Sequence, residues 1–257
     1  MSNAQVSISP TSVFIDNKRR FETILILNST ADPQEVTINY EFGYPISDSY
    51  GNLSVEYNDP DKEAQYSIAN WIKGFPKSFI LPAGQRQVVR LTVKPPNNLP
   101  DGMYWSRLKT TSANVTPPVG EPAADNITAQ INFQFEQVTS VFYKSGTLST
   151  GLEIENIRYD VTDHKLIVYA DLKHMGNSPY LGSMIMNITE LTGAPIKDSR
   201  VFISVYFDGT RRVETEISNL VSGAYNAIVS FTTKRDDIPD ENLVQANPTS
   251  QSFKFTK

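Results

Sequence analysis

Few residues of this chain could carry out covalent or metal chemistry. Its 257 residues include no Cys and only two His, at His164 and His174, which leaves no thiolate nucleophile and no cysteine-based zinc site. We expect both histidines in exposed loops. Ser106 and Lys109 have a Ser-x-x-Lys spacing, but the enzymes that use it carry the nucleophile on a helix, whereas Ser106 lies in a predicted strand. We therefore expect no enzyme, no catalytic residue and no cofactor.

Two acidic clusters, at 59–61 and 236–241, have oxygen ligands of the kind that Ca²⁺ prefers. Neither cluster has the spacing of an EF-hand loop. Exposed acidic turns account for both, and we expect no metal site.

A different kind of chemistry is available to 127–136, which reads ITAQINFQFE. Apolar and polar residues alternate here without a break, so a strand would have one fully apolar face. A strand covering the core of a sandwich alternates in the same way. The pattern therefore predicts the strand and leaves open whether its apolar face covers the core or binds a partner.

The composition predicts an all-β protein. The chain has 16 Pro, 13 Gly and many short Val/Ile/Thr/Tyr/Phe runs separated by turn residues, and its length suits two domains of roughly 100–140 residues. The net charge of −5 argues against a nucleic-acid partner. No apolar run approaches the roughly 20 residues that span a bilayer, so we expect no membrane insertion. Residues 1–4 (MSNA) resemble vector-derived sequence, which would have replaced a native start and any signal peptide.

Period-two alternation places strands along the whole chain, with helices limited to single turns in loops. The predicted strands are 5–9, 12–16, 21–28, 35–42, 68–73, 77–81, 86–94, 103–110, 127–143, 153–160, 165–173, 181–189, 201–207, 225–233 and 251–255.

Three segments break the strand pattern. Residues 43–66 are polar, Tyr-rich and turn-rich, and we expect a long loop. Residues 112–126 contain three Pro and form a second predicted loop. The Ser/Gly/Thr-rich segment 146–151 has the composition of a linker between a first domain at 5–145 and a second at 152–257. Tyr225 in the second domain is similar to the tyrosine corner of immunoglobulin-like sandwiches.

The first domain resembles the N-terminal domain of the periplasmic pilus-assembly chaperones. The resemblance lies in the order and spacing of several marks, none of which is specific alone: Pro76, the turn Leu81-Pro82-x-Gly84, alternating Val89, Leu91 and Val93 beside Arg90, and Leu99-Pro100-Asp101 leading into Tyr104 and Trp105. It implies two tandem immunoglobulin-like β-sandwich domains, although the second domain is similar to the family only in architecture. It also implies location in the periplasm or at the cell surface of a bacterium.

The resemblance implies a partner-binding strand as well. In this family the strand that follows the proline-rich loop inserts alternating apolar side chains into the groove of an incomplete pilin subunit. The matching positions are Ile131, Phe133 and Phe135. The family also anchors the carboxylate of its subunit with an Arg and a Lys, and these positions hold Thr11 and Ser140 here.

Neither Thr11 nor Ser140 can supply a positive charge, so any carboxylate anchor must come from other residues. The candidate substitutes are Arg107, Lys109 and Lys144.

We therefore predict a non-enzymatic exported binding protein that holds a protein subunit by β-strand addition. The main alternative is a structural or adhesive sandwich of a cell-surface assembly. A third alternative is a carbohydrate-binding module, because six aromatic residues crowd 40–66 and such side chains stack on sugars.

Overall fold

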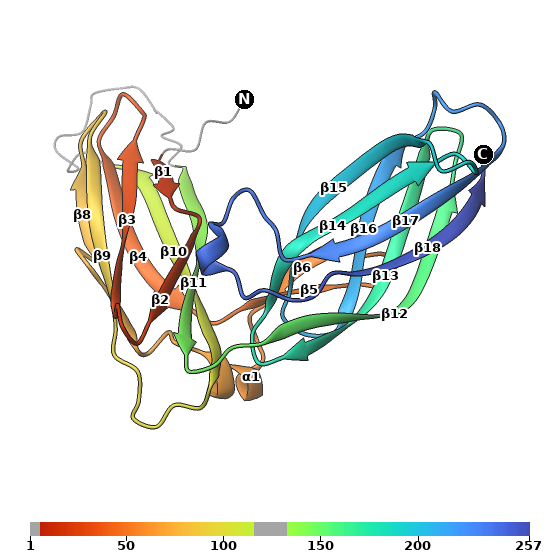
Figure 1. The fold of residues 1–257 in the computed structure, drawn as a ribbon. Coiled ribbons are helices and arrows are strands. Elements are labelled where there is room, and N and C mark those ends of the chain that lie inside the picture. The colour runs from red at the N-terminus through yellow and green to blue at the C-terminus, as the bar shows by residue number, and fades with distance from the viewer. Residues whose placement is uncertain (1–5, 116–132) are drawn as a thin grey trace, which may run out of the picture. The chain divides into compact units, whose positions relative to one another are not determined.

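The structure is a computed structural model that describes residues 6–115 and 133–257. The chain forms two compact units, each built of β-sheets (Figure 1). Unit 1 comprises Met1–Phe42, Pro60–Leu99 and Tyr104–Ser145, and unit 2 comprises Gly43–Asp59, Pro100–Met103 and Gly146–Lys257. The predicted all-β fold of two tandem sandwiches is confirmed. Within the described ranges, no helix is long and apolar enough to cross a bilayer.

Unit 1 is a sandwich of a four-stranded and a five-stranded sheet. The first has the order β1 (Val6–Ser9), β3 (Phe21–Asn28), β9 (Arg86–Val93), β7 (Ile72–Phe75). The second has the order β2 (Ser12–Asp16), β11 (Gln134–Ser145), β10 (Gly102–Asn114), β4 (Gln34–Glu41), β8 (Ser78–Leu81). The first two strands are separated at Pro10, which has no N–H for a ladder. As a result β1 pairs with β3 in one sheet and β2 pairs in parallel with β11 in the other.

The core of unit 1 follows from period-two alternation in both sheets. Ile24 and Ile26 of β3 face Val141 and Tyr143 of β11 across the sandwich, and all are fully buried with Leu91. Alternate residues of the same strands therefore point away from this core.

Unit 2 is a second sandwich, of three and four strands. Its sheets have the orders β12 (Thr150–Val161), β13 (Lys165–Gly176), β16 (Gly209–Glu216) and β15 (Pro195–Val205), β14 (Tyr180–Thr189), β17 (Ala224–Thr232), β18 (Thr249–Thr256). A 3₁₀ turn, Asp240–Asn242, precedes the last strand. The Tyr225 hydroxyl donates to the carbonyl oxygen of Val221 at 2.7 Å, as expected of a tyrosine corner.

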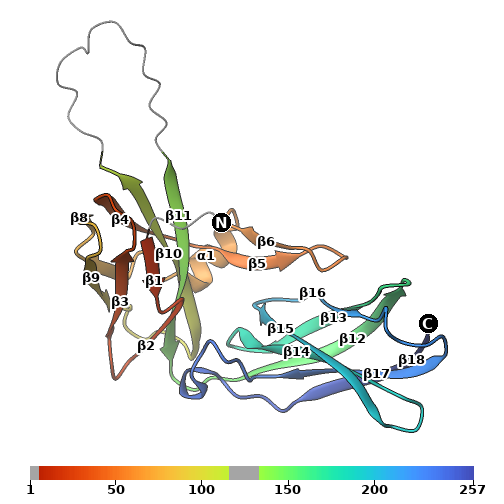
Figure 2. The ribbon, with the colours of Figure 1, turned by 90° about the horizontal axis from the view of Figure 1, so that it is seen from above.

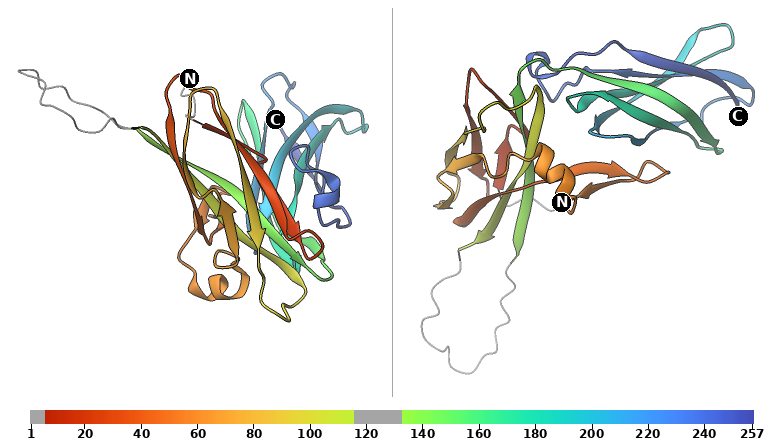
Figure 3. Two further views of the ribbon diagram at one scale, coloured as in Figure 1. Left: turned by 90° about the vertical axis from the view of Figure 1, so that its left-hand side faces the viewer. Right: turned by 90° about the horizontal axis from the view of Figure 1, so that it is seen from below.

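The prediction of a long loop at 43–66 is wrong. This segment contains the hairpin β5 (Tyr44–Ser47) and β6 (Leu53–Glu56), followed by the helix α1 (Pro60–Tyr66), which is also longer than the single turn expected (Figure 3, orange). The Asp48 carboxylate closes the hairpin by accepting from the backbone N–H of Tyr50 and of Asn52 at 2.8 and 2.9 Å. Pro60 starts the helix, where its missing N–H costs nothing.

The hairpin clusters with unit 2, although its sequence lies inside the predicted first domain. Ser47 Oγ accepts from the backbone N–H of Thr210 and from Arg211 Nη1, both at 3.0 Å. Arg158 donates to the carbonyl oxygen of Ser49 at 2.8 Å. Tyr44 packs edge-on against Phe207, with ring centroids 4.9 Å apart.

Candidate functional site

The strand predicted to bind a partner is only partly covered by its neighbours. Strand β11 runs beside β10 (Figure 2), and β2 pairs with its other edge only from Ser140 to Lys144. The Ser140 N–H donates to the Thr11 carbonyl oxygen at 3.2 Å, so the backbone N–H of Ser140 points to the edge of β11 that β2 occupies. Because alternate residues share that direction, the backbone groups of Glu136 and Val138 point to the same edge, where the described residues place no further strand. One side-chain hydrogen bond is made near this edge: Gln137 Nε2 donates to the Val6 carbonyl oxygen at 2.7 Å.

The predicted inserting residues lie at the open end of this strand. Phe135 is half-buried and shares its sheet face with the core residues Val141 and Tyr143. Phe133 immediately precedes the strand and is 64% exposed. Ile131 lies outside the described residues. Phe135 thus continues the core-facing side of β11 toward solvent. Phe133 comes before it, is largely exposed and contributes little to the core.

The two positions that correspond to the family's charged anchor are adjacent. Ser12, the neighbour of Thr11 in sequence, is in register with Ser140 across the parallel pair. Arg107 of β10 lies on the other side of β11, and its Nη1 donates to Ser140 Oγ at 2.7 Å. The Arg107 guanidinium therefore lies beside Ser140, although neither Thr11 nor Ser140 is itself charged.

The other two candidate cations have different surroundings. Lys109 Nζ forms an ion pair with Glu136 at 3.0 Å. Lys144 Nζ lies 5.1 Å from the centre of the Phe14 ring, which stacks on Phe142 with centroids 4.9 Å apart. Only Arg107 among the three is hydrogen-bonded to Ser140.

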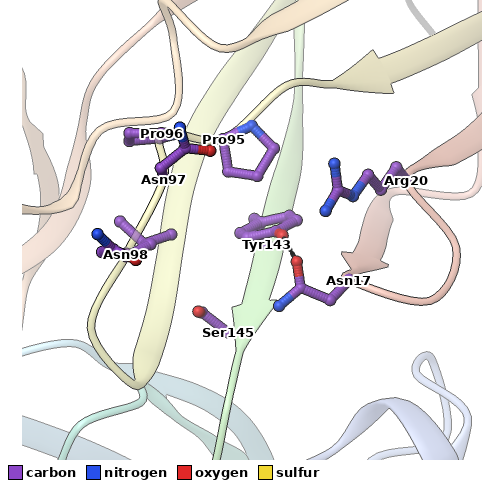
Figure 4. A pocket seen from close by; sticks show the side chains of 9 residues that line it. Asn17, Arg20, Pro95, Pro96, Asn97, Asn98, Tyr143 and Ser145 are labelled. Carbon is purple, nitrogen blue, oxygen red and sulfur yellow. Dashed lines mark hydrogen bonds between the residues drawn. The ribbon is translucent and has the colours of Figure 1, made fainter.

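A polar cavity of about 300 Å³ lies elsewhere in unit 1, at the end of β11 (Figure 4). The Tyr143 hydroxyl donates to Asn17 Oδ1 in its wall, and Arg20 and Ser145 also line it. Burial raises the pKa of Tyr143, and the positive charge of Arg20 opposes that rise. This cavity could not be predicted from sequence, because its residues come from three segments that are separate along the chain.

The described residues offer little for catalysis or metal binding. The Ser106 side chain is buried in β10 and donates to the Glu41 carbonyl oxygen at 3.0 Å. His164 lies in an exposed turn, as expected. His174 does not, because it lies within β13 and is half-buried, and its Nε2 contacts the Ser178 carbonyl oxygen at 2.8 Å. Burial lowers the pKa of His174. No group of three His, Asp or Glu side chains suited to a metal occurs in the described part of the chain.

The aromatic residues of 40–66 are divided between packing and exposure. Phe42 and Tyr66 both stack on Trp105, with centroids 5.7 and 4.8 Å away, and Tyr44 is buried. Tyr50 and Tyr57 are exposed.

Comparison with known proteins finds solved structures whose fold is similar to that of this chain. No family model matches the sequence. No curated protein matches it either. Among solved structures, the YadV chaperone has 12% sequence identity and a TM-score of 0.47, over 96% of this chain and 100% of its own.

Two further similar structures are chaperones by title. A chain of the Salmonella enterica SafA pilin–SafB chaperone complex has 14% identity and a TM-score of 0.45, over 98% of both chains. The E. coli chaperone DraB has 13% identity and a TM-score of 0.46, over 98% of this chain and 95% of its own. All three matches extend along nearly the whole length of this chain.

Proposed function

We propose that this protein is a non-enzymatic, exported binding protein that holds a partner polypeptide by adding a partner strand to β11. The observation that carries the proposal is the edge of β11 before Ser140, which the described residues leave without a neighbouring strand. Its location would be the periplasm or cell surface of a bacterium. Its client would be a pilin-like or other surface subunit that lacks one strand.

Backbone pairing would supply affinity that does not depend on sequence. Glu136 and Val138 direct N–H and C=O groups to the open edge, and an extended partner segment can pair with both. Apolar side chains would supply specificity. Phe133 and Phe135, with Ile131 before them, would fill the apolar groove that a missing strand leaves in the client.

Arg107 is the candidate that we propose as the carboxylate anchor. A guanidinium forms short, charge-assisted and often bidentate bonds with a carboxylate, and a carboxylate is a stronger acceptor than the Ser140 hydroxyl that Arg107 now contacts. Ser140 and Thr11 would provide neutral donors beside it. Lys109 and Lys144 would be secondary, because the first is paired with Glu136 and the second lies over Phe14.

The test is co-purification after export in the native host, comparing wild type with Phe133→Asp. A charge at the centre of an inserted apolar series cannot be buried unpaired, so the variant should lose a stoichiometric small β-rich partner that wild type retains. Leu191→Asp is the matched control, because Leu191 is similarly exposed at 57% but lies in a turn of unit 2. Circular dichroism must show that each variant is folded.

Three outcomes would contradict the proposal. If Phe133→Asp unfolds while Leu191→Asp does not, Phe133 belongs to the core. If both variants keep the partner, binding does not use this strand. If all three proteins are folded and purify alone, the structural or adhesive alternative gains support, and soluble glycans that change tyrosine fluorescence would favour the carbohydrate-binding alternative.

A further inference from the structure

The four-stranded sheet of unit 1 has an outward face that the proposed function does not use. Strand register assigns its members without ambiguity, because each is paired with another residue of the same face and alternates with a core residue. The outward-facing residues are Ser7 and Ser9 of β1; Phe21, Thr23, Leu25 and Leu27 of β3; Arg86, Val88, Arg90 and Thr92 of β9; and Lys73 and Phe75 of β7. We call these residues the outer face.

Large apolar side chains of the outer face are in contact with solvent. Phe75 is 80% exposed and Val88 is 52% exposed, and Phe21 and Leu27 are also exposed. They come from three adjacent strands and are not confined to one corner. Several exposed large apolar side chains on one face of a folded protein can mark an interaction site.

The charge of the outer face is of one sign. Its ionisable residues are Arg86, Arg90 and Lys73, and none of its members is acidic, although the whole chain has a net charge of −5. Arg90 lies over the Phe21 ring at 4.2 Å from its centre, and Arg19 approaches the same ring at 5.5 Å. Glu22, the acidic residue of β3, alternates to the other side of the strand and pairs with Arg19 at 3.0 Å.

We propose that the outer face is a peripheral docking surface for an anionic phospholipid bilayer. A sheet presents its side chains in one layer, so basic and apolar groups from three strands can reach a flat surface together. Each Arg or Lys gains from the negative potential of anionic headgroups, and exposed apolar side chains can enter the boundary between headgroups and acyl chains. Hydroxyl groups between them, from Ser9, Thr23 and Thr92, are tolerated in that layer.

The experiment is co-sedimentation of the full chain with vesicles of phosphatidylglycerol and phosphatidylcholine, compared with vesicles of phosphatidylcholine alone. We expect binding to the anionic vesicles only, weakening as ionic strength rises because the charges are screened. The double variant Arg86→Glu/Arg90→Glu should lower the apparent affinity by at least about tenfold. Phe75→Ser/Val88→Ser should lower the affinity that remains at high salt.

The matched control is Lys234→Glu/Lys254→Glu, which makes the same change in net charge at exposed positions of unit 2. It should bind like wild type. Three results would overturn the proposal: no binding of wild type to anionic vesicles, an equal loss in the two charge-reversed variants, or equal binding to neutral vesicles. The first result, together with a stable complex between the outer face and an acidic protein, would assign the surface to a polypeptide partner.

Discussion

The buried guanidinium under the β5–β6 hairpin allows a quantitative test of how the hairpin is held. Arg211 is only 3% exposed and has no carboxylate partner within the described residues. Its Nη1 donates to Ser47 Oγ and to the Thr210 carbonyl oxygen at 3.0 and 2.9 Å, and its Nη2 donates to the Ser204 carbonyl oxygen at 2.8 Å. Burial lowers the pKa of Arg211 to about 10. This cation is therefore costly to bury, and each hydrogen bond to it matters.

Replacing Ser47 with Ala removes the acceptor of two buried donors. The bond from the charged Arg211 is worth about 1.5–3 kcal/mol, and the bond from the Thr210 amide is worth about 1 kcal/mol. We expect Ser47→Ala to lower the free energy of unfolding of unit 2 by about 2–4 kcal/mol. Ser54→Ala is the control, because Ser54 is an exposed hairpin residue, and it should change stability by less than about 0.5 kcal/mol.

A double-mutant cycle isolates the contribution of Arg211. Arg211→Met removes the buried charge together with its three hydrogen bonds, and it is the second single variant of the cycle. In that background Ser47→Ala should cost only the amide bond, about 1 kcal/mol, so the coupling energy should be about 1–3 kcal/mol.

The measurement is urea unfolding followed by circular dichroism and by tryptophan fluorescence. Both tryptophans, Trp71 and Trp105, lie in unit 1, so fluorescence separates an effect on unit 1 from one on unit 2. A coupling energy below about 0.5 kcal/mol would refute the reasoning, because that is the level at which independent sites add.

Two further predictions concern unit 2. The hydrogen bond from Arg158 holds the pKa of Asp171 below its ordinary value of 3.8. The contribution of ionised Asp171 to the stability of the folded state is therefore complete above that value, and it is lost as pH falls through the lower, folded-state pKa. The difference in thermal midpoint between wild type and Asp171→Asn should shrink over that acid range, and a difference that stays constant with pH would contradict the assignment. Tyr225→Phe removes the bond to Val221 and should cost about 0.5–1.5 kcal/mol in urea unfolding, whereas Tyr50→Phe, at an exposed ring, should cost nothing measurable; equal effects would argue against the tyrosine corner.

The strands that cover a core could be predicted because one of their faces is buried. Val89, Leu91 and Val93 alternate with exposed residues, and β9 is found at 86–93 against a prediction of 86–94. The same logic failed for the hairpin at 44–56, because Ile46, Leu53 and Val55 are all exposed and no periodic apolar face marks the strands. The helix at 60–66 is too short to show a helical period, and it has no buried residue.

The candidate site could be predicted only in its sequence-local part. Alternation predicted a strand at 127–143, and β11 is found at Gln134–Ser145, with Phe135 inside it and Phe133 just before it. This pattern needs only consecutive residues. The contact between Arg107 and Ser140 depends on the register of β10 and β11, whose sequences are separated by a long loop. Arg107, Lys109 and Lys144 were therefore equivalent from sequence, and hydrogen-bond geometry distinguishes them. The role of these residues in binding stays a prediction.

The assignment of the β5–β6 hairpin to unit 2 has a consequence for how the chain is made. Ser47 and Thr210 are 163 positions apart, so a ribosome releases the hairpin long before it releases the strand that the hairpin contacts. Unit 2 can complete its fold only after nearly the whole protein has been synthesised, and loop-closure entropy makes such distant contacts slow to form. A fragment that starts at Gly146 would lack the hairpin and expose Arg211, so dividing the gene between the two sandwiches should yield a second half that folds less stably than it does in the intact chain.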